Sequence, residues 1–455
     1  MFPFKIKEVL TKKTKEEENL IKIKKDLSCP YGCTDVYEDE NMILSSKISL
    51  GFDTMNTKRN CNSILFGGAG SGKTRLFTVP NLLQANCNYV IVNEIDDVYN
   101  RTKDFFISQG YKVKCLNLSN IEESTCYNPF QYIDTDKDII KISKLISLEM
   151  DENEDPFFKK AKESLLCAGI DYMMKNHPHS KCTIKLLLEF FNKMEYDIDC
   201  LLNTLPTKSI GYEKYQTYNL CSSSQKSEII YSLRKLLAKI ISNTSSILEK
   251  DEMNFEDFKK RKAILYIILP YNDDKGKFLT TLLIEQLHSY LINNQKVLNE
   301  EEEIFANMHK RNKPKYTLCT QPKLKYHLKF MIEQLEILPK IELEMLLSIS
   351  RPYNISFSIT TNTISVLRHI GYDIGAVMGN CDSIIFFGST DIETCNYFNT
   401  LSTINNVNGT TKCFMTTDEF LRLECNKCVI LIRGYEPIID DKYELTKHKN
   451  YKYYD

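Results

Sequence analysis

Eight consecutive residues have the types and spacing of a segment that binds a triphosphate: Gly67, Gly68, Ala69, Gly70, Ser71, Gly72, Lys73 and Thr74. They fit the pattern G-x-x-x-x-G-K-[ST], in which glycines allow a tight turn whose N–H groups point at phosphate oxygens. We expect the Lys73 ammonium to reach the β- and γ-phosphates and the Thr74 hydroxyl to hold Mg²⁺, with Arg75 completing the binding segment. This segment therefore predicts binding of ATP together with Mg²⁺.

The flanking residues supply the structural context that this pattern requires. The apolar run Ser63–Phe66 precedes the glycines and predicts a buried strand, and helix-permissive residues follow Thr74. A helix that begins there would add the positive end of its dipole to the loop. The alternative is a glycine-rich turn that binds nothing, and the order of strand, loop and helix favours the phosphate-binding interpretation.

The second half of such a site should be an acidic residue that ends a neighbouring strand and binds Mg²⁺. The run Leu328–Leu335 is strand-like and contains Glu333, which is the expected metal-side acid. The next residue, where a catalytic glutamate is expected, is Gln334. An amide cannot take a proton from water at neutral pH, and loss of such a base typically lowers a rate by ~10²–10⁴-fold.

Other residues leave the question of hydrolysis open. Glu336 lies two residues beyond this amide, and Glu94, Asp96 and Asp97 follow an earlier strand-like run, so another carboxylate could serve. A glutamine can also orient an attacking water without deprotonating it. The opposite interpretation is that Glu333 merely ends a strand and that turnover has been lost.

The rest of the chain alternates between strand-like and helical patterns. Apolar runs of strand length occur at 63–66, 88–92, 112–118, 263–269, 328–335, 355–360, 383–388 and 428–433, about eight in all. Helical spacing occurs at 97–108, 278–294 and 341–349. This alternation predicts an α/β fold with a mainly parallel sheet covered on both faces. From Asp136 to about Lys250 the spacing is helical throughout, which predicts an inserted all-α domain.

Composition places few restrictions on partners. The chain has 455 residues and a formal net charge of −1, so any contact with nucleic acid must come from a local patch. No apolar run approaches the roughly 18–20 residues that span a bilayer, and no signal-peptide pattern follows the N-terminus, which predicts a cytoplasmic protein.

A basic run from Lys310 to Lys329, interleaved with Tyr316 and Tyr326, follows the acidic run Glu300–Glu303. We interpret it as a solvated hairpin, with a nucleic-acid contact as the alternative.

The sixteen cysteines of the chain suit small core residues of a reducing compartment. Two pairs, Cys29 with Cys33 and Cys425 with Cys428, have spacings that zinc sites use. Neither pair has a second pair or histidines nearby in the sequence, so we favour free thiols over zinc ligands.

A series of short segments resembles the type IV coupling proteins of bacterial conjugation and secretion, the TraG-type P-loop ATPases in their Gram-positive form. The segments are Asn41–Leu44, Lys58–Asn60, Lys73–Arg75, Pro80–Gln84, Gly110–Val113, Cys126–Phe130, Asp155–Phe158, Gly379–Asp382 and Leu445–His448. A single tetrapeptide is weak support, but this ordered series runs from about Asn41 to the C-terminus and is specific.

The resemblance implies a RecA-like motor domain with a helical insertion, assembled as a homo-hexamer that couples ATP hydrolysis to substrate transfer. The substrate would be DNA, single-stranded and bound to a relaxase, or a secreted protein, and the other partners would be secretion-channel components at the membrane. By position, 1–50 would be a leader, 51–150 and 254–455 the nucleotide-binding domain, and 151–253 an all-α substrate-recognition domain. Arg351 lies where the family places an arginine that faces a neighbouring subunit's nucleotide. With Lys73, Glu333 and Gln334 it completes the expected catalytic set.

The chain departs from the family pattern around the nucleotide. Glu333-Gln334 replaces an Asp-Glu pair, Asn93–Asp97 replaces Asp-Pro-Lys-Gly-Glu, and Asn362 replaces a glutamine. The N-terminal transmembrane helices of most members are not expected here, so contact with the membrane would be through partners. Three functions follow: an ATP-driven coupling motor of type IV secretion, a hydrolysis-impaired ATP-binding adaptor, and a soluble DNA-translocating ATPase outside secretion.

Overall fold

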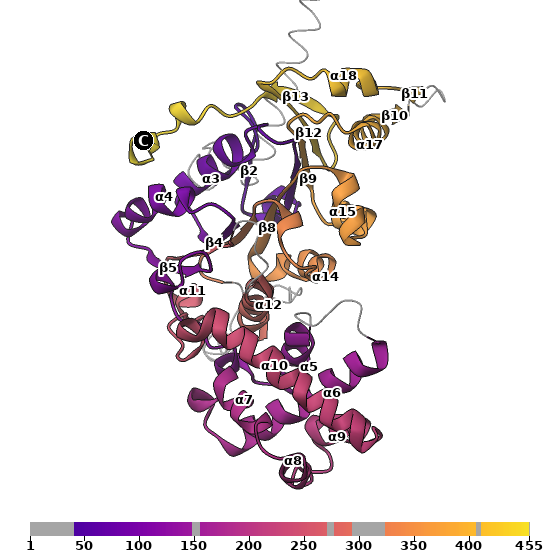
Figure 1. Cartoon of the computed structure of the whole chain (residues 1–455). Coiled ribbons are helices and arrows are strands. Elements are labelled where there is room, and N and C mark those ends of the chain that lie inside the picture. The colour runs from indigo at the N-terminus through magenta and orange to yellow at the C-terminus, as the bar shows by residue number, and fades with distance from the viewer. Residues whose placement is uncertain (1–40, 148–154, 271–276, 294–323, 406–410, 455) are drawn as a thin grey trace, which may run out of the picture. The chain divides into compact units, whose positions relative to one another are not determined.

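A nine-stranded sheet is the framework that positions the candidate residues (Figure 1). The structure is a computed structural model that describes residues 41–147, 155–270, 277–293, 324–405 and 411–454. In sheet order, the strands are β13 (Ile438–Asp441), β12 (Lys427–Ile432), β9 (Ser383–Phe386), β3 (Ser63–Phe66), β8 (Ile355–Thr361), β7 (Leu328–Ile332), β4 (Asn88–Asn93), β6 (Ala263–Ile268) and β5 (Lys112–Asn117). Two small antiparallel sheets pair β1 (Asn41–Ile43) with β2 (Ser49–Gly51) and β10 (Ile404–Asn405) with β11 (Thr411–Lys412).

Five neighbouring strands, β9, β3, β8, β7 and β4, run parallel, so their carboxyl ends meet at one edge of the sheet. The register places Phe66 beside Thr361 and Val92 beside Ile332. The segments that follow β3, β8, β7 and β4 therefore emerge side by side. This convergence is what brings residues from distant parts of the sequence into one site.

The eight expected strands are all present, and a ninth, β13, was missed. It pairs antiparallel with β12, which in turn pairs antiparallel with β9. Its four residues alternate between buried and exposed or half-buried positions and include only two apolar side chains, Ile438 and Ile439. So short an edge strand carries too little hydrophobic pattern to be recognised in the sequence.

One residue of the expected basic run is not solvated. Lys329 lies inside β7, a strand that is buried along its whole length, and only 1% of its surface is exposed. The basic residues from Lys310 to Lys323 lie outside the described residues. The interpretation of a solvated hairpin was therefore wrong for Lys329.

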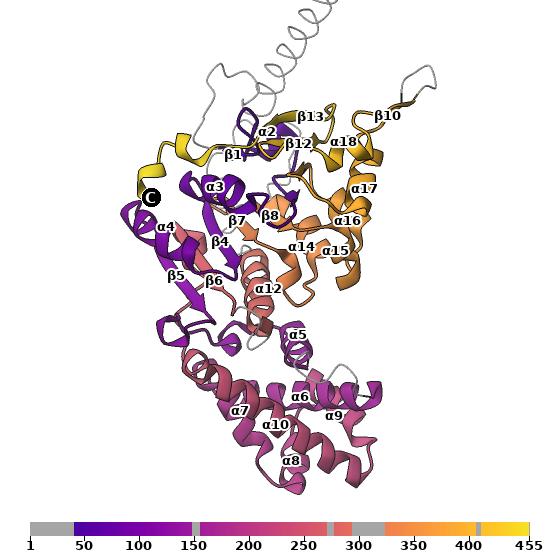
Figure 2. The ribbon, with the colours of Figure 1, turned by 45° about the horizontal axis from the view of Figure 1, so that its top comes forward.

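Helices cover both faces of the sheet, as Figures 1 and 2 show, with α3 and α4 on one face and α14 to α17 on the other. Right-handed crossovers explain this, because the chain moves in one direction from β3 to β4 and in the other from β7 through β8 to β9. These helices are α3 (Val79–Leu83), α4 (Asp97–Ser108), α14 (Leu343–Ile349), α15 (Ile364–Ile370), α16 (Ile374–Gly379) and α17 (Ile392–Ser402). Shorter helices are α2 (Thr54–Thr57), α11 (Asp257–Lys260) and α18 (Thr417–Leu421).

By internal packing the chain divides into two compact units. One comprises the chain up to Val113, Phe258–Ile264 and Val297 onward, and the other comprises Lys114–Asp257 and Leu265–Lys296. The helices of the second unit are α5 (Asp136–Ser147), α6 (Pro156–Asn176), α7 (Ile184–Phe191), α8 (Glu195–Leu202), α9 (Ile210–Asn219), α10 (Ser223–Leu248) and α12 (Lys277–Asn293). The predicted helical region is thus confirmed.

Close packing holds α6 against α9. A Cβ atom on Gly211 would lie 2.5 Å from Asp171 Oδ2, so the contact requires glycine. The Gly211 N–H donates to this carboxylate, which is buried and also paired with Lys175. The buried charge is thus satisfied within the unit.

Residues 41–50 belong to the core of the first unit. Met42 and Leu50 are fully buried in a cluster that includes Leu65 and Ile385. The side chain of Asn81 bridges β1 to α3, accepting from the Ile43 N–H at 2.8 Å and donating to the Ile43 carbonyl at 2.9 Å. Within the described ranges, no helix has both the length and the apolar character needed to cross a membrane.

Candidate nucleotide-binding site

The glycine-rich loop follows β3 at the carboxyl edge of the sheet. Gly70 and Gly72 have φ angles of 75° and 90°, which non-glycine residues rarely adopt. A Cβ atom on Gly72 would lie 2.7 Å from Leu76 Cδ1, and one on Gly67 would lie 2.4 Å from Ser71 Oγ. The geometry of this loop therefore requires glycine at positions 70 and 72 and disfavours a side chain at position 67.

A π-helical turn, η2 (Thr74–Thr78), connects the loop to α3. The Val79 N–H donates to the Thr74 carbonyl, a bond that spans five residues. Pro80 has no N–H and so cannot form the α-helical bond to Leu76. Single π turns of this kind occur often at functional sites.

Lys73 lies at the centre of the site. Its ammonium donates to the carbonyls of Gly67 at 2.6 Å and Gly68 at 3.1 Å, and to Asn362 Oδ1 at 2.8 Å. Burial lowers the pKa of Lys73, while the charges of Glu336 and Glu333 raise it. Asn362, noted in the sequence as a departure from the family, thus touches the P-loop lysine directly.

Glu333 directly follows β7, and its N–H donates to the Val92 carbonyl at 2.9 Å. Only 6% of Glu333 is exposed. Burial raises the pKa of its carboxyl group, whereas the hydroxyls of Thr78 and Thr74 and the charge of Lys73 lower it. The structure therefore brings together Thr74 and Glu333, the two expected metal ligands.

Several buried oxygens at this edge fit a magnesium-bound nucleotide. Among the described residues, Glu333 Oε1, Thr361 Oγ1 and Asn93 Oδ1 have no hydrogen-bond partner. All three lie at the ends of neighbouring strands. Carboxylate, hydroxyl and amide oxygens are the hard ligands that Mg²⁺ prefers, directly or through water. Buried polar atoms without a partner are otherwise rare and costly.

Gln334 begins a sharp turn in the chain. Its φ of 54° lies in the left-handed region, and its N–H donates to Thr360 Oγ1 at 3.0 Å. The short helix η7 (Leu335–Ile337) follows and carries Glu336, whose Oε1 accepts from the Asn362 N–H at 3.2 Å. Burial raises the pKa of the Glu336 carboxyl group.

The other three candidate acids, which follow β4 in the sequence, have different surroundings. Asp96 and Asp97 are exposed at the start of α4, and Asp97 forms an ion pair with Arg101 at 2.7 Å. Glu94 is half-buried in the same connection.

Arg351 lies at the opposite edge of the sheet from Lys73. It begins the short helix η8 (Arg351–Tyr353), which precedes the amino end of β8, and its guanidinium donates to the Thr54 carbonyl at 3.0 Å. The fold of one chain thus does not bring it to the P-loop. The expected role toward a neighbouring subunit's nucleotide stays a prediction.

Lys442, which follows β13, is a site residue that no sequence pattern indicated. Its ammonium donates to the carbonyls of Ser71 at 3.0 Å and Phe387 at 2.8 Å, and it lies 4.7 Å from the centre of the Phe387 ring. Burial lowers the pKa of Lys442. The only nearby signal in the sequence was the family-like segment Leu445–His448.

The C-terminal segment also lines a cavity beside the loop. The cavity has a volume of about 360 Å³ and is lined by Gly70, Ser71, Gly72, Arg75, Leu76, Cys425, Glu444, Leu445 and Thr446. Its position next to the phosphate loop suits the sugar and base of a nucleotide.

The cysteine pair near the C-terminus is split between two environments. Cys425 is exposed, and Cys428 is buried within β12. The described ranges contain no group of three or more histidine, cysteine or acidic side chains placed to hold a metal ion. Cys29 and Cys33 lie outside those ranges.

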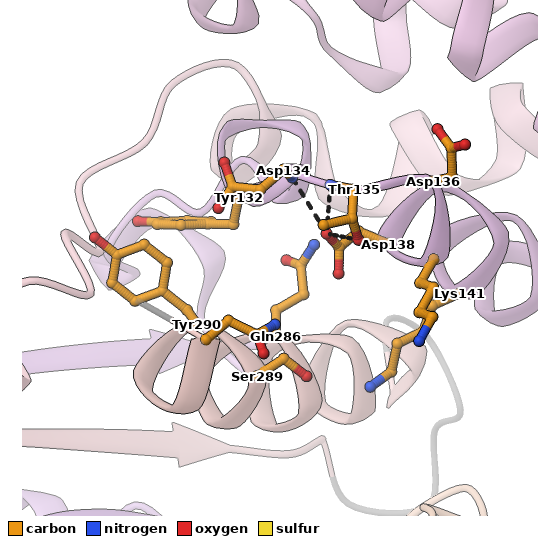
Figure 3. Close-up of a pocket in the computed structure, with 11 residues that line it drawn as sticks. Tyr132, Asp134, Thr135, Asp136, Asp138, Lys141, Gln286, Ser289 and Tyr290 are labelled. Atoms are coloured by element: carbon orange, nitrogen blue, oxygen red, sulfur yellow. Dashed lines mark hydrogen bonds between the residues drawn. The ribbon is translucent and has the colours of Figure 1, made fainter. Parts of the chain in front are cut away.

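A second cavity, of about 790 Å³, lies in the helical unit (Figure 3). Many of its polar groups already stabilise the cavity walls. Asp138 accepts from the N–H and the hydroxyl of Thr135, both at 2.8 Å, and so caps the start of α5. Lys141 pairs with Glu285 at 2.9 Å, and the Tyr132 hydroxyl donates to Asp251. These contacts account for the polar residues that line the cavity, so no ligand is needed to explain them.

The fold and the P-loop site define a RecA-like P-loop protein, with β8 between the loop strand β3 and the acid-bearing strand β7. A sequence profile of the family described as type IV secretory system conjugative DNA transfer matches residues 5–306. The chain therefore belongs to this family, and the expected family membership is confirmed. A comparison with curated proteins gives no match.

Solved structures of a bacterial conjugative coupling protein, TrwB, share this fold. The unbound form of TrwBdeltaN70 matches with a TM-score of 0.63 and 13% identity, over 90% of this chain and 89% of that chain. TrwB in complex with ADP and Mg²⁺ matches with a TM-score of 0.60 and 14% identity, over 86% of each chain. TrwB with the ATP analogue ADPNP matches with a TM-score of 0.59 and 14% identity, over 84% of each chain. At such low identity these matches establish the fold alone.

Proposed function

We propose that this protein binds ATP with Mg²⁺ at the carboxyl edge of its sheet and acts as a coupling ATPase of a type IV secretion system. The observation that carries the proposal is the position of the Lys73 ammonium, held in the glycine loop near the buried Glu333 and the half-buried Glu336. Membership of a conjugative DNA transfer family supports the biological role. The complexes of TrwB with ADP and Mg²⁺ and with an ATP analogue support the choice of ligand.

Each residue of the site has a distinct task in this proposal. The loop N–H groups and Lys73 bind the phosphates and neutralise charge on the γ-phosphate. Asn362 and Lys442 fix the lysine and the loop backbone. Mg²⁺, when bound, would be held by Thr74 and Glu333 and would neutralise further charge on the phosphate oxygens.

Substrate and assembly are part of the same proposal. We assign DNA, single-stranded and bound to a relaxase, or a secreted protein as the substrate, and the helical region 151–253 as its receptor. A homo-hexamer would let Arg351 face the nucleotide of a neighbouring subunit, with its planar guanidinium on the γ-phosphate. We expect the ring to act on the cytoplasmic side and to reach the membrane through channel components.

A hydrolysis-impaired adaptor is the second candidate, and Gln334 at the expected position of the catalytic glutamate favours it. In that case bound ATP would fix a conformation that recruits partners. A DNA-translocating ATPase outside secretion has less support, because the family is one of conjugative transfer.

Turnover of ATP with and without single-stranded DNA tests the proposal. We expect DNA to stimulate hydrolysis, and we expect hydrolysis to accompany the assembly of the chains into rings. Sedimentation measures this assembly. Lys73→Met should abolish hydrolysis, while Lys112→Met, at an exposed lysine of β5 outside the proposed receptor, should leave it unchanged. Tight ATP binding with no turnover in any assembly state would instead select the adaptor.

A further inference from the structure

The acid expected beside the nucleotide is displaced by two residues in the sequence. Gln334 occupies the position of the catalytic glutamate, and its amide cannot accept a proton. The nearest acid after it is Glu336, which lies in η7. The question is whether the fold returns this carboxylate to the site.

The backbone conformation of Gln334 brings the Glu336 carboxylate back to the carboxyl edge of the sheet. A non-glycine residue with φ of 54° is unusual, and such conformations cluster at functional sites because the surrounding structure must hold them. Here the Gln334 N–H donates to Thr360 Oγ1 at 3.0 Å, and the next residue, Leu335, is fully buried. These two contacts fix the turn that directs Glu336 back to the carboxyl edge.

Asn362 connects the returned carboxylate to the P-loop lysine. Its N–H donates to Glu336 Oε1 at 3.2 Å, and its side-chain oxygen accepts from the Lys73 ammonium at 2.8 Å. Glu336 is also the acid whose charge acts most strongly on Lys73, ahead of Glu333. A single residue, Asn362, therefore connects Glu336 to the Lys73 ammonium, the group that we expect to bind the γ-phosphate.

One oxygen of this carboxylate remains available. Glu336 Oε2 is buried and forms no hydrogen bond of normal geometry among the residues that the structure describes, and the nearby hydroxyl of Thr361, which lowers the pKa of the carboxyl group, is likewise unpaired. A carboxylate oxygen that is not otherwise bonded can take a proton from water and release it again.

We propose that Glu336, rather than Gln334, is the carboxylate that activates the attacking water, an assignment that rests on the ATPase function proposed above. The water oxygen forms a bond to the γ-phosphorus while the bond from that phosphorus to the β,γ-bridging oxygen breaks. The electron pair of the broken bond stays with ADP. Glu336 Oε2 takes a proton from the water and releases it to solvent, so that ATP and water give ADP, phosphate and one proton.

Single-turnover hydrolysis and ATP affinity, measured together on the full chain, test this assignment. Glu336→Gln should lower the rate by ~10²–10⁴-fold and leave the affinity for ATP with Mg²⁺ within about threefold. Glu336→Asp keeps the carboxylate and should lose less. Gln334→Ala should stay within about tenfold of the wild type, because its amide takes no proton.

The pH profile separates a base from a merely structural carboxylate. The wild-type rate should fall as the pH drops through the pKa of Glu336, and this limb should be absent from the residual rate of Glu336→Gln. Glu336→Gln that binds ATP and hydrolyses it at the wild-type rate would overturn the assignment but not the ATPase. A wild-type chain that binds ATP without turnover would overturn the assignment and select the adaptor, and one that does not bind ATP would reject both proposals.

Discussion

The two edges of the parallel sheet each bury a lysine, and the groups around the two lysines differ. Lys73 lies at the carboxyl edge and Lys329 toward the amino edge, and burial lowers the pKa of both. A buried ammonium is costly unless its hydrogens have acceptors. Both lysines meet that requirement, so burial by itself does not distinguish them.

The side chains around Lys329 are paired with one another. Its ammonium donates to Met42 Sδ at 2.9 Å, the Cys61 carbonyl at 3.3 Å and Ser356 Oγ at 3.4 Å. The two ring nitrogens of His327 bond Asn354 and Ser356, and burial lowers the pKa of His327 to about 3. The imidazole is thus neutral at physiological pH, and the polar groups around Lys329 satisfy one another.

The carboxyl edge differs because its lysine lies beside acids whose oxygens are not all used. Among the described residues, Glu333 and Glu336 each keep one buried oxygen without a hydrogen-bond partner. Unpaired acceptors beside a buried cation therefore mark the site of chemistry, and a buried cation alone does not.

The largest expected effect is that of Lys73→Met. Removal of the ammonium should lower ATP turnover by more than about 10³-fold, because the developing charge on the γ-phosphate loses its main protein counter-charge. A steady-state phosphate-release assay measures this. Turnover that survives the substitution would remove the functional difference between the two edges.

Glu333→Gln should have the next largest effect. We expect the rate at saturating ATP to fall ~10²-fold and its dependence on Mg²⁺ to weaken, because an amide is a poorer metal ligand than a carboxylate.

The same variant has a pH signature in its stability. Burial raises the folded-state pKa of Glu333 above its unfolded value, so the wild type loses stability as the pH rises through that pKa. Glu333→Gln should therefore melt higher than the wild type at pH 8, and the difference should shrink as the pH falls. A constant difference in melting temperature would contradict the buried position of this acid.

Lys442→Ala should weaken ATP binding about tenfold, because the loop carbonyl of Ser71 loses a charged donor worth about 1.5–3 kcal/mol. Lys442→Arg keeps the charge and should retain more of the affinity. Unchanged affinity in Lys442→Ala would mean that the C-terminal segment does not shape the loop. Calorimetric titration with ATP and Mg²⁺ decides between these outcomes.

The smallest expected effect on activity is that of Lys329→Met. It removes a buried charge that forms no ion pair among the described residues, so the cost of holding an ammonium out of water disappears together with its three hydrogen bonds. We expect unchanged turnover and an equal or higher melting temperature at neutral pH. A loss of turnover would show that Lys329 itself takes part in catalysis.

Local patterns in the sequence predicted the loop, eight strands and the helical region, because each depends on residues close together in the chain. Lys442 could not be predicted, since its contact with Ser71 spans 371 residues and depends on where β13 places the chain. Glu336 was only one of several candidate acids, because the left-handed turn at Gln334 that returns it to the edge has no signature without glycine. Lys329 was misread because it was grouped with the basic residues that precede it, although it lies within the apolar strand β7, where the register pairs it with Tyr89 and Ser356.

Titration calorimetry of ATP with Mg²⁺ into the wild type, Lys73→Met and Lys329→Met measures whether the nucleotide binds at the carboxyl edge. We expect the wild type and Lys329→Met to bind with equal affinity, and Lys73→Met to lose at least about tenfold. No uptake of ATP by the wild type, or equal uptake by all three proteins, would contradict it.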